Sequence, residues 1–283
     1  MGFCKIGIQW NATKEQGLDA AQRLIHILQE RNIQVCINAS LSDALNRPEL
    51  KENSDFAGCE MLIVLGGDGT ILRALDYAIP NDLPILGVNL GRLGFLSEVE
   101  LDGLEADILQ VLDGNYTIDE RMIMCVDGYD SNTMFALNEI TIDRATPEVR
   151  ILSLEYYANN TIINRIAGDG LIIATATGST AYSLSAGGPI VSPGLDCFVL
   201  TPVCPHMLNV RPVVLSSTDS ITVQTTDERS EARAVLDGRK FIPLHGENAG
   251  ITIRRAERSA KFIRLHDRNY FDLLRGKLSE WTH

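Results

Sequence analysis

One stretch limits the possible folds of this chain more than any other. The apolar run Met61–Leu65 is followed at once by a glycine-rich loop, Gly66–Thr70. Apolar residues then return at helical spacing, at Ile71, Leu72 and Leu75. The pattern predicts a buried strand, a tight loop and the start of a helix. Because glycine amides at a helix N-terminus can converge on an anion, the loop is typical of a phosphate-binding site.

An acid stands inside this loop, where a bare carboxylate would repel a phosphate. Asp68 therefore needs a role, and it could hold Mg²⁺ or orient or deprotonate an attacking hydroxyl group. A second interpretation is a plain turn, in which Gly66, Gly67 and Gly69 supply positive φ angles. The spacing fits neither a P-loop, which needs a Lys-Ser/Thr pair, nor the G-x-G-x-x-G dinucleotide fingerprint.

Length and charge restrict the class of protein. The 283 residues suffice for a large core and favour two domains. The net charge of −12 argues against a nucleic-acid partner and against docking on an anionic membrane. No apolar run approaches ~18 residues, so no membrane-spanning helix is predicted. The six cysteines form no C-x-x-C pair, so we expect neither a disulfide framework nor a zinc module. We expect the protein to be cytoplasmic.

The first part of the chain alternates apolar strands with helical patterns, which predicts an α/β domain with a parallel sheet. The expected strands are residues 5–10, 33–37, 61–65 and 84–88. Ligands bind such sheets at the carboxyl ends of the strands. A second glycine-rich loop, Asn89–Leu96, follows the last of these strands at the same edge. Its Arg92 could meet a phosphate, and its Phe95 could stack on a ligand ring or belong to the core.

From about Thr117 the period changes from helical to alternating, and β-branched residues, Asn and Gly dominate. This predicts an all-β, sandwich-like second domain, with Asp237-Gly238 as a turn signal between two of its later strands. We place the α/β domain at residues 1–115 and the β-rich domain at 116–261. The tail, 262–283, is a candidate to pack back onto the first domain.

Two features of the second domain are candidates for ligand contacts. Small hydroxyl residues and glycines crowd the stretch Thr175–Gly188, just after an apolar strand, which suits a polar ligand lying close to backbone. The alternative for this stretch is a well-capped turn with a packed tyrosine. Asn138 and Glu139 interrupt another apolar segment, and a carboxylate is the usual partner of the two hydroxyls of a ribose.

Together these blocks resemble the NAD kinases over nearly the whole chain. Four blocks carry the resemblance, in the family's order: Gly66–Thr70, Asn89–Leu96, Leu137–Glu139 and Asp169–Pro189. The first is shared with lipid kinases of the diacylglycerol and sphingosine type and with phosphofructokinases, whereas Thr177–Tyr182 is far more specific. The chain departs from the family at Ala176, where Pro is usual, which loses a rigid turn residue but no chemical group.

The resemblance implies an enzyme that phosphorylates the 2′-hydroxyl of the adenosine ribose of NAD with ATP, giving NADP and ADP. The Gly66–Thr70 loop, with Gly66, Gly67, Gly69 and Thr70, would cradle the ATP phosphates with Mg²⁺ or another divalent metal. Asp68 would be the catalytic residue. The other ligand-binding residues are expected to be Arg92, Phe95, Asn138, Glu139, Asp169, Thr177, Thr180, Ala181, Tyr182, Ser185 and Asp237. Members of the family are usually cytoplasmic homodimers or homotetramers.

Two alternatives belong to other functional classes. A lipid kinase of the diacylglycerol type would need an apolar cleft, whereas the Thr177–Ser185 cluster is small and polar. A catalytically silent NAD-binding sensor would keep Asn138, Glu139 and Asp169 but lose the phosphate loop, and here that loop is intact.

Overall fold

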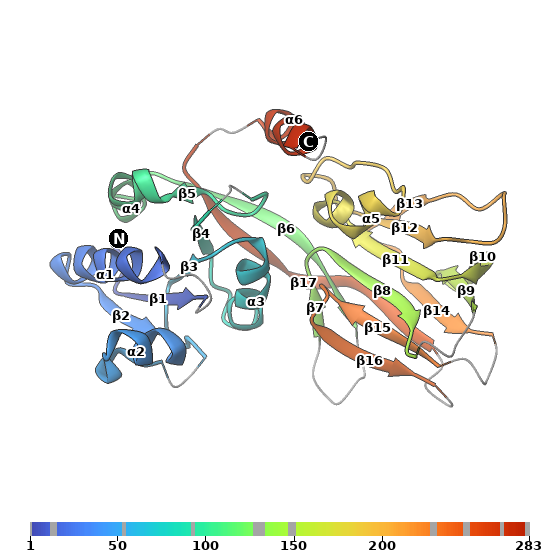
Figure 1. Cartoon of the computed structure of the whole chain (residues 1–283), viewed down its shortest axis with the longest axis horizontal. Coiled ribbons are helices and arrows are strands. Elements are labelled where there is room, and N and C mark those ends of the chain that lie inside the picture. The colour runs from blue at the N-terminus through green and yellow to red at the C-terminus, as the bar shows by residue number, and fades with distance from the viewer. Residues whose placement is uncertain are drawn as a thin grey trace. The chain divides into compact units, whose positions relative to one another are not determined.

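A computed structural model describes residues 2–11, 16–52, 55–91, 94–126, 134–146, 151–226, 231–245, 250–266 and 269–280. The chain folds into two compact units, Met1–Glu120 with Ala260–His283, and Arg121–Ser259. Two strands contribute residues to both units, β6 (Thr117–Val126) and β17 (Gly250–Arg264) (Figure 1).

The first unit alternates strands and helices. Its strands are β1 (Lys5–Trp10), β2 (Gln34–Ile37), β3 (Met61–Leu65), β4 (Ile85–Asn89) and the short β5 (Val99–Glu100). Its helices are α1 (Gln16–Glu30), α2 (Ala39–Leu45), α3 (Asp68–Ala78), α4 (Leu104–Leu112) and α6 (Tyr270–Glu280), with short 3₁₀ turns η1 (Pro48–Leu50) and η2 (Leu101–Gly103).

The strands of this unit form the parallel sheet that the sequence predicts. The order is β17-β4-β3-β1-β2, and the pairs among β1 to β4 are parallel. Strands β3 and β4 are buried along their whole length, which explains their unbroken apolar runs. Helices α1 and α2 are in contact with each other, and both pack against β1. Because the strands are parallel, the loops that follow β3 and β4 meet at one edge of the sheet.

The second unit is an antiparallel β-sandwich. One sheet has the order β13-β12-β11-β8-β15-β16, and in the other β10, β9, β14 and β17 are neighbours in that order, with β6 beside β17 and β7 beside β6. Inward-facing residues of both sheets, such as Ile140, Tyr156, Phe198 and Ile253, share one core. This confirms the predicted fold class of an α/β domain followed by an all-β domain.

The elements of the second unit are mostly short strands. They are β7 (Met134–Ala136), β8 (Glu139–Arg144), β9 (Leu152–Ala158), β10 (Thr161–Gly168), β11 (Gly170–Thr175), β12 (Cys197–Val203), β13 (Val213–Ser216), β14 (Ile221–Thr225), β15 (Ala232–Leu236) and β16 (Lys240–Leu244), with the turns η3 (Thr177–Thr180) and α5 (Tyr182–Ser185). Among the residues described in both units, no helix has the length and apolar character needed to cross a bilayer.

Candidate active site

The glycine-rich loop after β3 joins a fully buried strand to helix α3. Gly66 extends the sheet ladder, because its N–H donates to the carbonyl of Val88 at 2.9 Å. Gly67 is the N-cap of α3, so the amides of Asp68 and Gly69 have no acceptor within the helix. These amides, together with the positive end of the helix dipole, favour an anion at this position.

The backbone conformation excludes the plain-turn interpretation of this loop. The described glycines with positive φ are Gly58, Gly114, Gly187 and Gly238, so none of the three loop glycines needs its conformational freedom.

The three loop glycines differ in what surrounds them. A Cβ on Gly66 would lie 2.4 Å from the Thr70 hydroxyl oxygen, so packing requires glycine there. A Cβ on Gly67 or Gly69 would meet no atom of the chain within 4 Å. Glycine at 67 and 69 therefore leaves open space around backbone amides, as a phosphate site requires.

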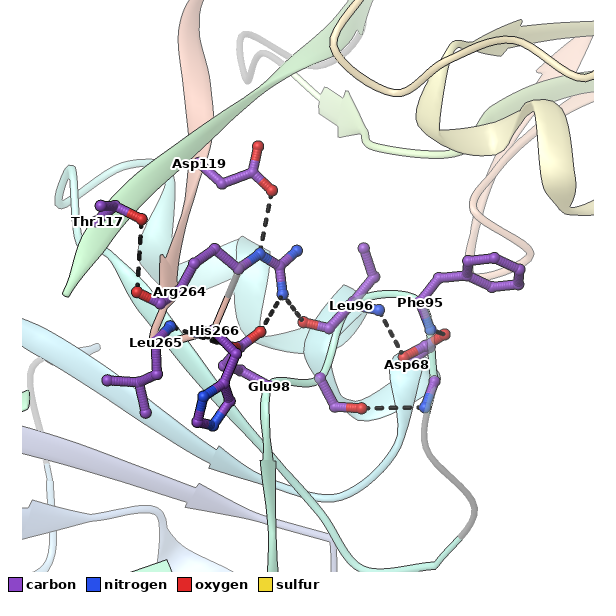
Figure 2. Close-up of polar contacts among 11 residues, drawn as sticks. Asp68, Phe95, Leu96, Glu98, Thr117, Asp119, Arg264, Leu265 and His266 are labelled. Carbon is purple, nitrogen blue, oxygen red and sulfur yellow. Dashed lines mark hydrogen bonds and ion pairs between the residues drawn. The ribbon is translucent and has the colours of Figure 1, made fainter. Parts of the chain in front are cut away.

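The Asp68 carboxylate is held by the second glycine-rich loop. It accepts hydrogen bonds from the backbone N–H groups of Phe95, at 2.9 Å on Oδ2, and Leu96, at 3.2 Å on Oδ1 (Figure 2). The approach is close enough that a Cβ on Gly94 would lie 2.0 Å from Asp68 Oδ1, so only glycine fits. The two glycine loops are thus tied together through the acid.

The structure places the two ligand candidates of the second loop differently. Phe95 is half-buried and is not part of the buried core. In Figure 2 its ring extends away from the Asp68 carboxylate, which favours the ligand-facing interpretation over the core one. Arg92 lies outside the described residues.

A buried acid that the sequence analysis did not single out supports this loop from behind. Glu98 is 2% exposed. Its Oε1 accepts the backbone N–H groups of Leu265 and His266, each at 3.0 Å, and its Oε2 lies 3.3 Å from Arg264 Nη1 (Figure 2). The same Arg264 nitrogen donates to the Leu96 carbonyl at 3.2 Å. The end of β17 therefore clamps the segment whose amides hold Asp68.

We expect Glu98→Gln to lower the free energy of unfolding by about 1–3 kcal/mol, because it removes the buried charge that pairs with Arg264, which then keeps its more exposed partner Asp119 at 3.1 Å. Urea unfolding measures the change. Glu100→Gln is the matched control, since Glu100 is exposed and only two residues away. Equal stability of the two variants would contradict the clamp.

In the second unit, Asp237 organises the segment that carries Asn138 and Glu139. Its buried carboxylate accepts the backbone N–H groups of Leu137 at 2.9 Å, Asn138 at 2.8 Å and Glu139 at 3.1 Å. Burial raises the pKa of Asp237, and these three hydrogen bonds oppose the rise. A contact between Asp237 and a ligand stays a prediction. Asp237 and Gly238 both have positive φ, as the predicted turn between β15 and β16 requires.

Glu139 is a second strongly perturbed acid of this unit. Burial, reinforced by the nearby charge of Asp237, raises the pKa of Glu139 to about 8. Its Oε2 is buried and accepts no hydrogen bond from the described part of the chain. An unsatisfied buried carboxylate oxygen is costly, so it marks a place where a ligand hydroxyl can donate.

Asp169 and Tyr182 line one pocket of about 280 Å³ in the second unit. Its wall also holds Arg144, which pairs with Asp169 at 3.2 Å, and Arg233, whose guanidinium lies 2.6 Å from Asp143. One cavity therefore holds both positive guanidinium groups, which can bind a phosphate, and negative carboxylates, which can accept hydrogen bonds from a polar ligand.

The hydroxyl cluster after β11 divides into two sets. Ser179 and Ser183 are fully buried and have partners within the chain. The Ser179 hydroxyl donates to the Ala176 carbonyl and accepts the Val191 N–H, and the Ser183 hydroxyl is hydrogen-bonded to the Thr201 hydroxyl. The residues predicted to face the ligand are Thr177, Thr180, Ala181, Tyr182 and Ser185. Of these, Tyr182 and Ser185 are exposed, Thr177 and Ala181 are half-buried, and Thr180 is buried.

This cluster packs tightly against the Asn138 segment. A Cβ on Gly178 would lie 2.0 Å from the Asn138 carbonyl oxygen, and the Thr175 hydroxyl donates to the Leu137 carbonyl at 2.6 Å. Two of the predicted blocks, far apart in sequence, are therefore neighbours within the second unit.

Comparison with known proteins places the chain in a family. Residues 6–116 match the ATP-NAD kinase N-terminal domain, and residues 137–265 match the ATP-NAD kinase C-terminal domain. The chain belongs to the ATP-NAD kinase family. This confirms the resemblance found in the sequence, and neither the lipid-kinase nor the silent-sensor alternative is favoured.

Relatives of this ATP-NAD kinase family member match it along nearly their whole length. The NAD kinase of Natranaerobius thermophilus is 35% identical, and the aligned region covers 97% of each of the two chains. That of Moorella thermoacetica is 39% identical over 98% of this chain and 89% of the relative. An NAD kinase from Archaeoglobus fulgidus in complex with ATP has a TM-score of 0.78 at 27% identity, covering 97% of this chain and 98% of that one.

Yeast NADH kinase complexed with NADH supports the fold alone. It has a TM-score of 0.84 at 23% identity, over 99% of this chain and 88% of that one.

Proposed function

We propose that the protein transfers the γ-phosphoryl group of ATP to the 2′-hydroxyl of the adenosine ribose of NAD, giving NADP and ADP. The observation that carries this is the match to both domains of the ATP-NAD kinase family. The hydroxyl oxygen forms the new bond to phosphorus, the bond to the ADP oxygen breaks, and the hydroxyl proton leaves. We place the reaction in the cytoplasm and propose that the active form is a homodimer or homotetramer.

The Gly66–Thr70 loop binds the ATP phosphates. The amides of Asp68 and Gly69 and the open space at Gly67 and Gly69 support this assignment. Arg92 is assigned to the same phosphates by its charge. Bound phosphates repel a nearby carboxylate such as that of Asp68, so the site needs a cation to offset the repulsion.

Mg²⁺ enters as part of the substrate, bound to ATP. Magnesium usually binds proteins through one or two carboxylates and substrate phosphates. A Mg²⁺ ion carried by ATP fits the site better than one held in a closed protein cage. The one candidate cluster of metal ligands among the described residues lies away from the Gly66–Thr70 loop and contains two cysteines. The metal neutralises charge on the phosphates, and the residues of the chain position the reactants.

Asp68 orients the attacking hydroxyl and accepts its proton. Each of its oxygens takes one backbone N–H and keeps a second lone-pair direction for a substrate hydroxyl. The two hydrogen bonds hold the carboxylate in one orientation, as a general base requires.

The NAD pocket uses the second unit. Glu139 accepts the ribose hydroxyls on its unpartnered Oε2, and Asn138 and Thr177 contact the adenine end. The remaining residues assigned to the dinucleotide are Phe95, Asp169, Thr180, Ala181, Tyr182, Ser185 and Asp237.

A coupled assay tests the function. Purified protein is mixed with ATP, Mg²⁺ and NAD, and NADP is read with an NADP-specific dehydrogenase. We expect NADP formation that stops when Mg²⁺ or ATP is left out. Tight NAD binding without NADP formation would point to the sensor instead, and neither NAD binding nor NADP formation would point to lipid substrates.

Gly69→Ala separates ligand binding from folding. Because a Cβ at this helical position meets nothing and Ala favours helix, we expect unchanged or slightly higher stability, by at most about 1 kcal/mol. The methyl group would occupy space next to the phosphates, so KM for ATP should rise at least about tenfold. Gly66→Ala is the contrast, since its Cβ collides with Thr70 and should lower stability. A folded Gly69→Ala protein with normal KM for ATP would refute the cradle.

A further inference from the structure

Two cysteines that the proposed function does not use lie against each other in the first unit. Cys36 is in β2, and Cys59 lies two residues before β3. Their Sγ atoms are 3.1 Å apart, shorter than the ~3.5–4.0 Å of an ordinary non-bonded contact. Both are nearly buried, at 6% and 7% exposure.

Glycine in the strand between them brings the two sulfurs together. Gly7 of β1 is the register partner of Cys36, so both residues point to the same face of the sheet. The space above Gly7 is filled by the Phe56 ring, because a Cβ on Gly7 would lie 2.5 Å from it. Phe56 is 2% exposed, and its carbonyl accepts the Cys59 N–H at 3.1 Å. The buried ring thus holds Cys59 beside Cys36.

Charged groups beside the pair make the two thiols unequal. Lys5 Nζ lies 3.5 Å from Glu52 Oε2 and donates to the Ala57 carbonyl. The pKa of Cys59 is lowered, chiefly by the hydrogen bond from Cys36; burial opposes the shift, and the Lys5 charge reinforces it. The pKa of Cys36 is raised, first by its hydrogen bond to Cys59 and then by burial. Cys59 is therefore the better nucleophile, and Cys36 is the thiol that keeps its proton.

The cluster also resembles a metal site, and its charge decides between the two possibilities. The ligand atoms of Cys36, Glu52 and Cys59 lie within 4.8 Å of one another. Lys5, however, already lies beside Glu52, so a cation placed among these ligands would meet a resident positive charge. The same ammonium group favours a thiolate, which is the reactive form in thiol chemistry.

We propose that Cys36 and Cys59 form a dithiol that is converted reversibly to an intramolecular disulfide by a low-molecular-weight disulfide. The Cys59 thiolate attacks one sulfur of the small disulfide and releases one small thiol. Cys36 then loses its proton and attacks the Cys59 sulfur, which releases the second small thiol. Two protein thiols are oxidised, and one small disulfide is reduced to two thiols.

The test uses the full chain carrying Cys4→Ser and Cys204→Ser, because both of those cysteines are exposed and would react by themselves. The protein is incubated with oxidised glutathione, alkylated with N-ethylmaleimide in denaturant, digested and examined by mass spectrometry. We expect a peptide pair linked through Cys36 and Cys59, which dithiothreitol releases. The buried Cys125 and Cys197 should stay alkylatable and act as internal controls.

Single variants test the order of attack. Cys36→Ser should trap a glutathione adduct on Cys59, whereas Cys59→Ser should leave Cys36 reduced, and Cys36→Ala repeats the first result if serine disturbs the core. Lys5→Met should slow the reaction several-fold. Circular dichroism first establishes that each variant is folded.

Two results would overturn the proposal. One is full alkylation of both cysteines after glutathione treatment of the folded protein. The other is a stoichiometric zinc ion in the purified protein that shields both thiols until a chelator removes it.

Discussion

Asp68→Asn is expected to lower the turnover number for NADP formation at least about a hundredfold, because an amide cannot accept the hydroxyl proton. NAD affinity should stay nearly the same, since the pocket residues of the second unit are untouched. The measurement is kcat in the coupled assay together with the Kd for NAD from calorimetry.

The structure adds a cost that must be separated from the chemistry. The N–H groups of Phe95 and Leu96 bond different oxygens of Asp68, and Asn replaces one of these oxygens with an NH₂ donor, so one N–H group loses its acceptor. The unmatched group should lower stability by about 1–3 kcal/mol. The loss of turnover therefore needs a control that disturbs the same loop without removing the base.

Glu98→Gln is that control. It loosens the clamp behind Leu96 through Arg264 but leaves the Asp68 carboxylate in place. If Asp68 acts as the base, Asp68→Asn should lose far more turnover than Glu98→Gln. Near-normal turnover of Asp68→Asn, or equal losses in both variants, would refute the base assignment.

The affinity for NAD is expected to rise with pH, and Glu139 is the reason. The pKa of Glu139 is raised to about 8 by burial, so below that pH the carboxyl group of the free protein holds a proton. In the proposed complex, ribose hydroxyls that donate to Oε2 favour the ionised form, so we expect NAD binding to release this proton. The Kd for NAD should therefore fall by at most about tenfold per pH unit between pH 6 and 8, and level off above.

Calorimetry in buffers of different ionisation enthalpy measures both the affinity and the released proton. Glu139→Gln should bind NAD more weakly above pH 8 and show no dependence on pH in this range. Glu257→Gln is a matched control, since it makes the same substitution at an exposed glutamate of the same unit. An NAD affinity that does not change with pH in the unmodified protein would contradict the ribose role of Glu139.

Local pattern was enough to predict much of this protein. The five apolar residues of β3, followed by glycines, predict a buried strand and a phosphate loop, because burial and turn chemistry act on neighbouring residues. The same holds for the change to alternating strands after Thr117 and for the Asp237-Gly238 turn. The motif blocks also identified the family, which the comparisons confirm.

Other features were invisible because their partners lie far apart in the chain. Glu98 gives a sequence signal, a single acid between apolar Leu96 and Val99, but its partner Arg264 is 166 residues away. Asp237 reads as a turn residue, and only the fold brings its carboxylate to the amides of Leu137–Glu139. The scattered cysteines gave no motif, yet Gly7 and Phe56 bring two of them into contact.

The sequence by itself determined which residues are the candidates for the chemistry, because the phosphate loop and the Thr177–Tyr182 block are continuous in the chain. Only the tertiary structure decided how those residues are held. It excluded positive φ as the reason for the loop glycines, placed Asp68 on the amides of the second loop, and left Glu139 Oε2 without a partner. The physical reason is that hydrogen bonding and desolvation depend on distances between atoms. For residues far apart in sequence, only the folding of the chain sets those distances.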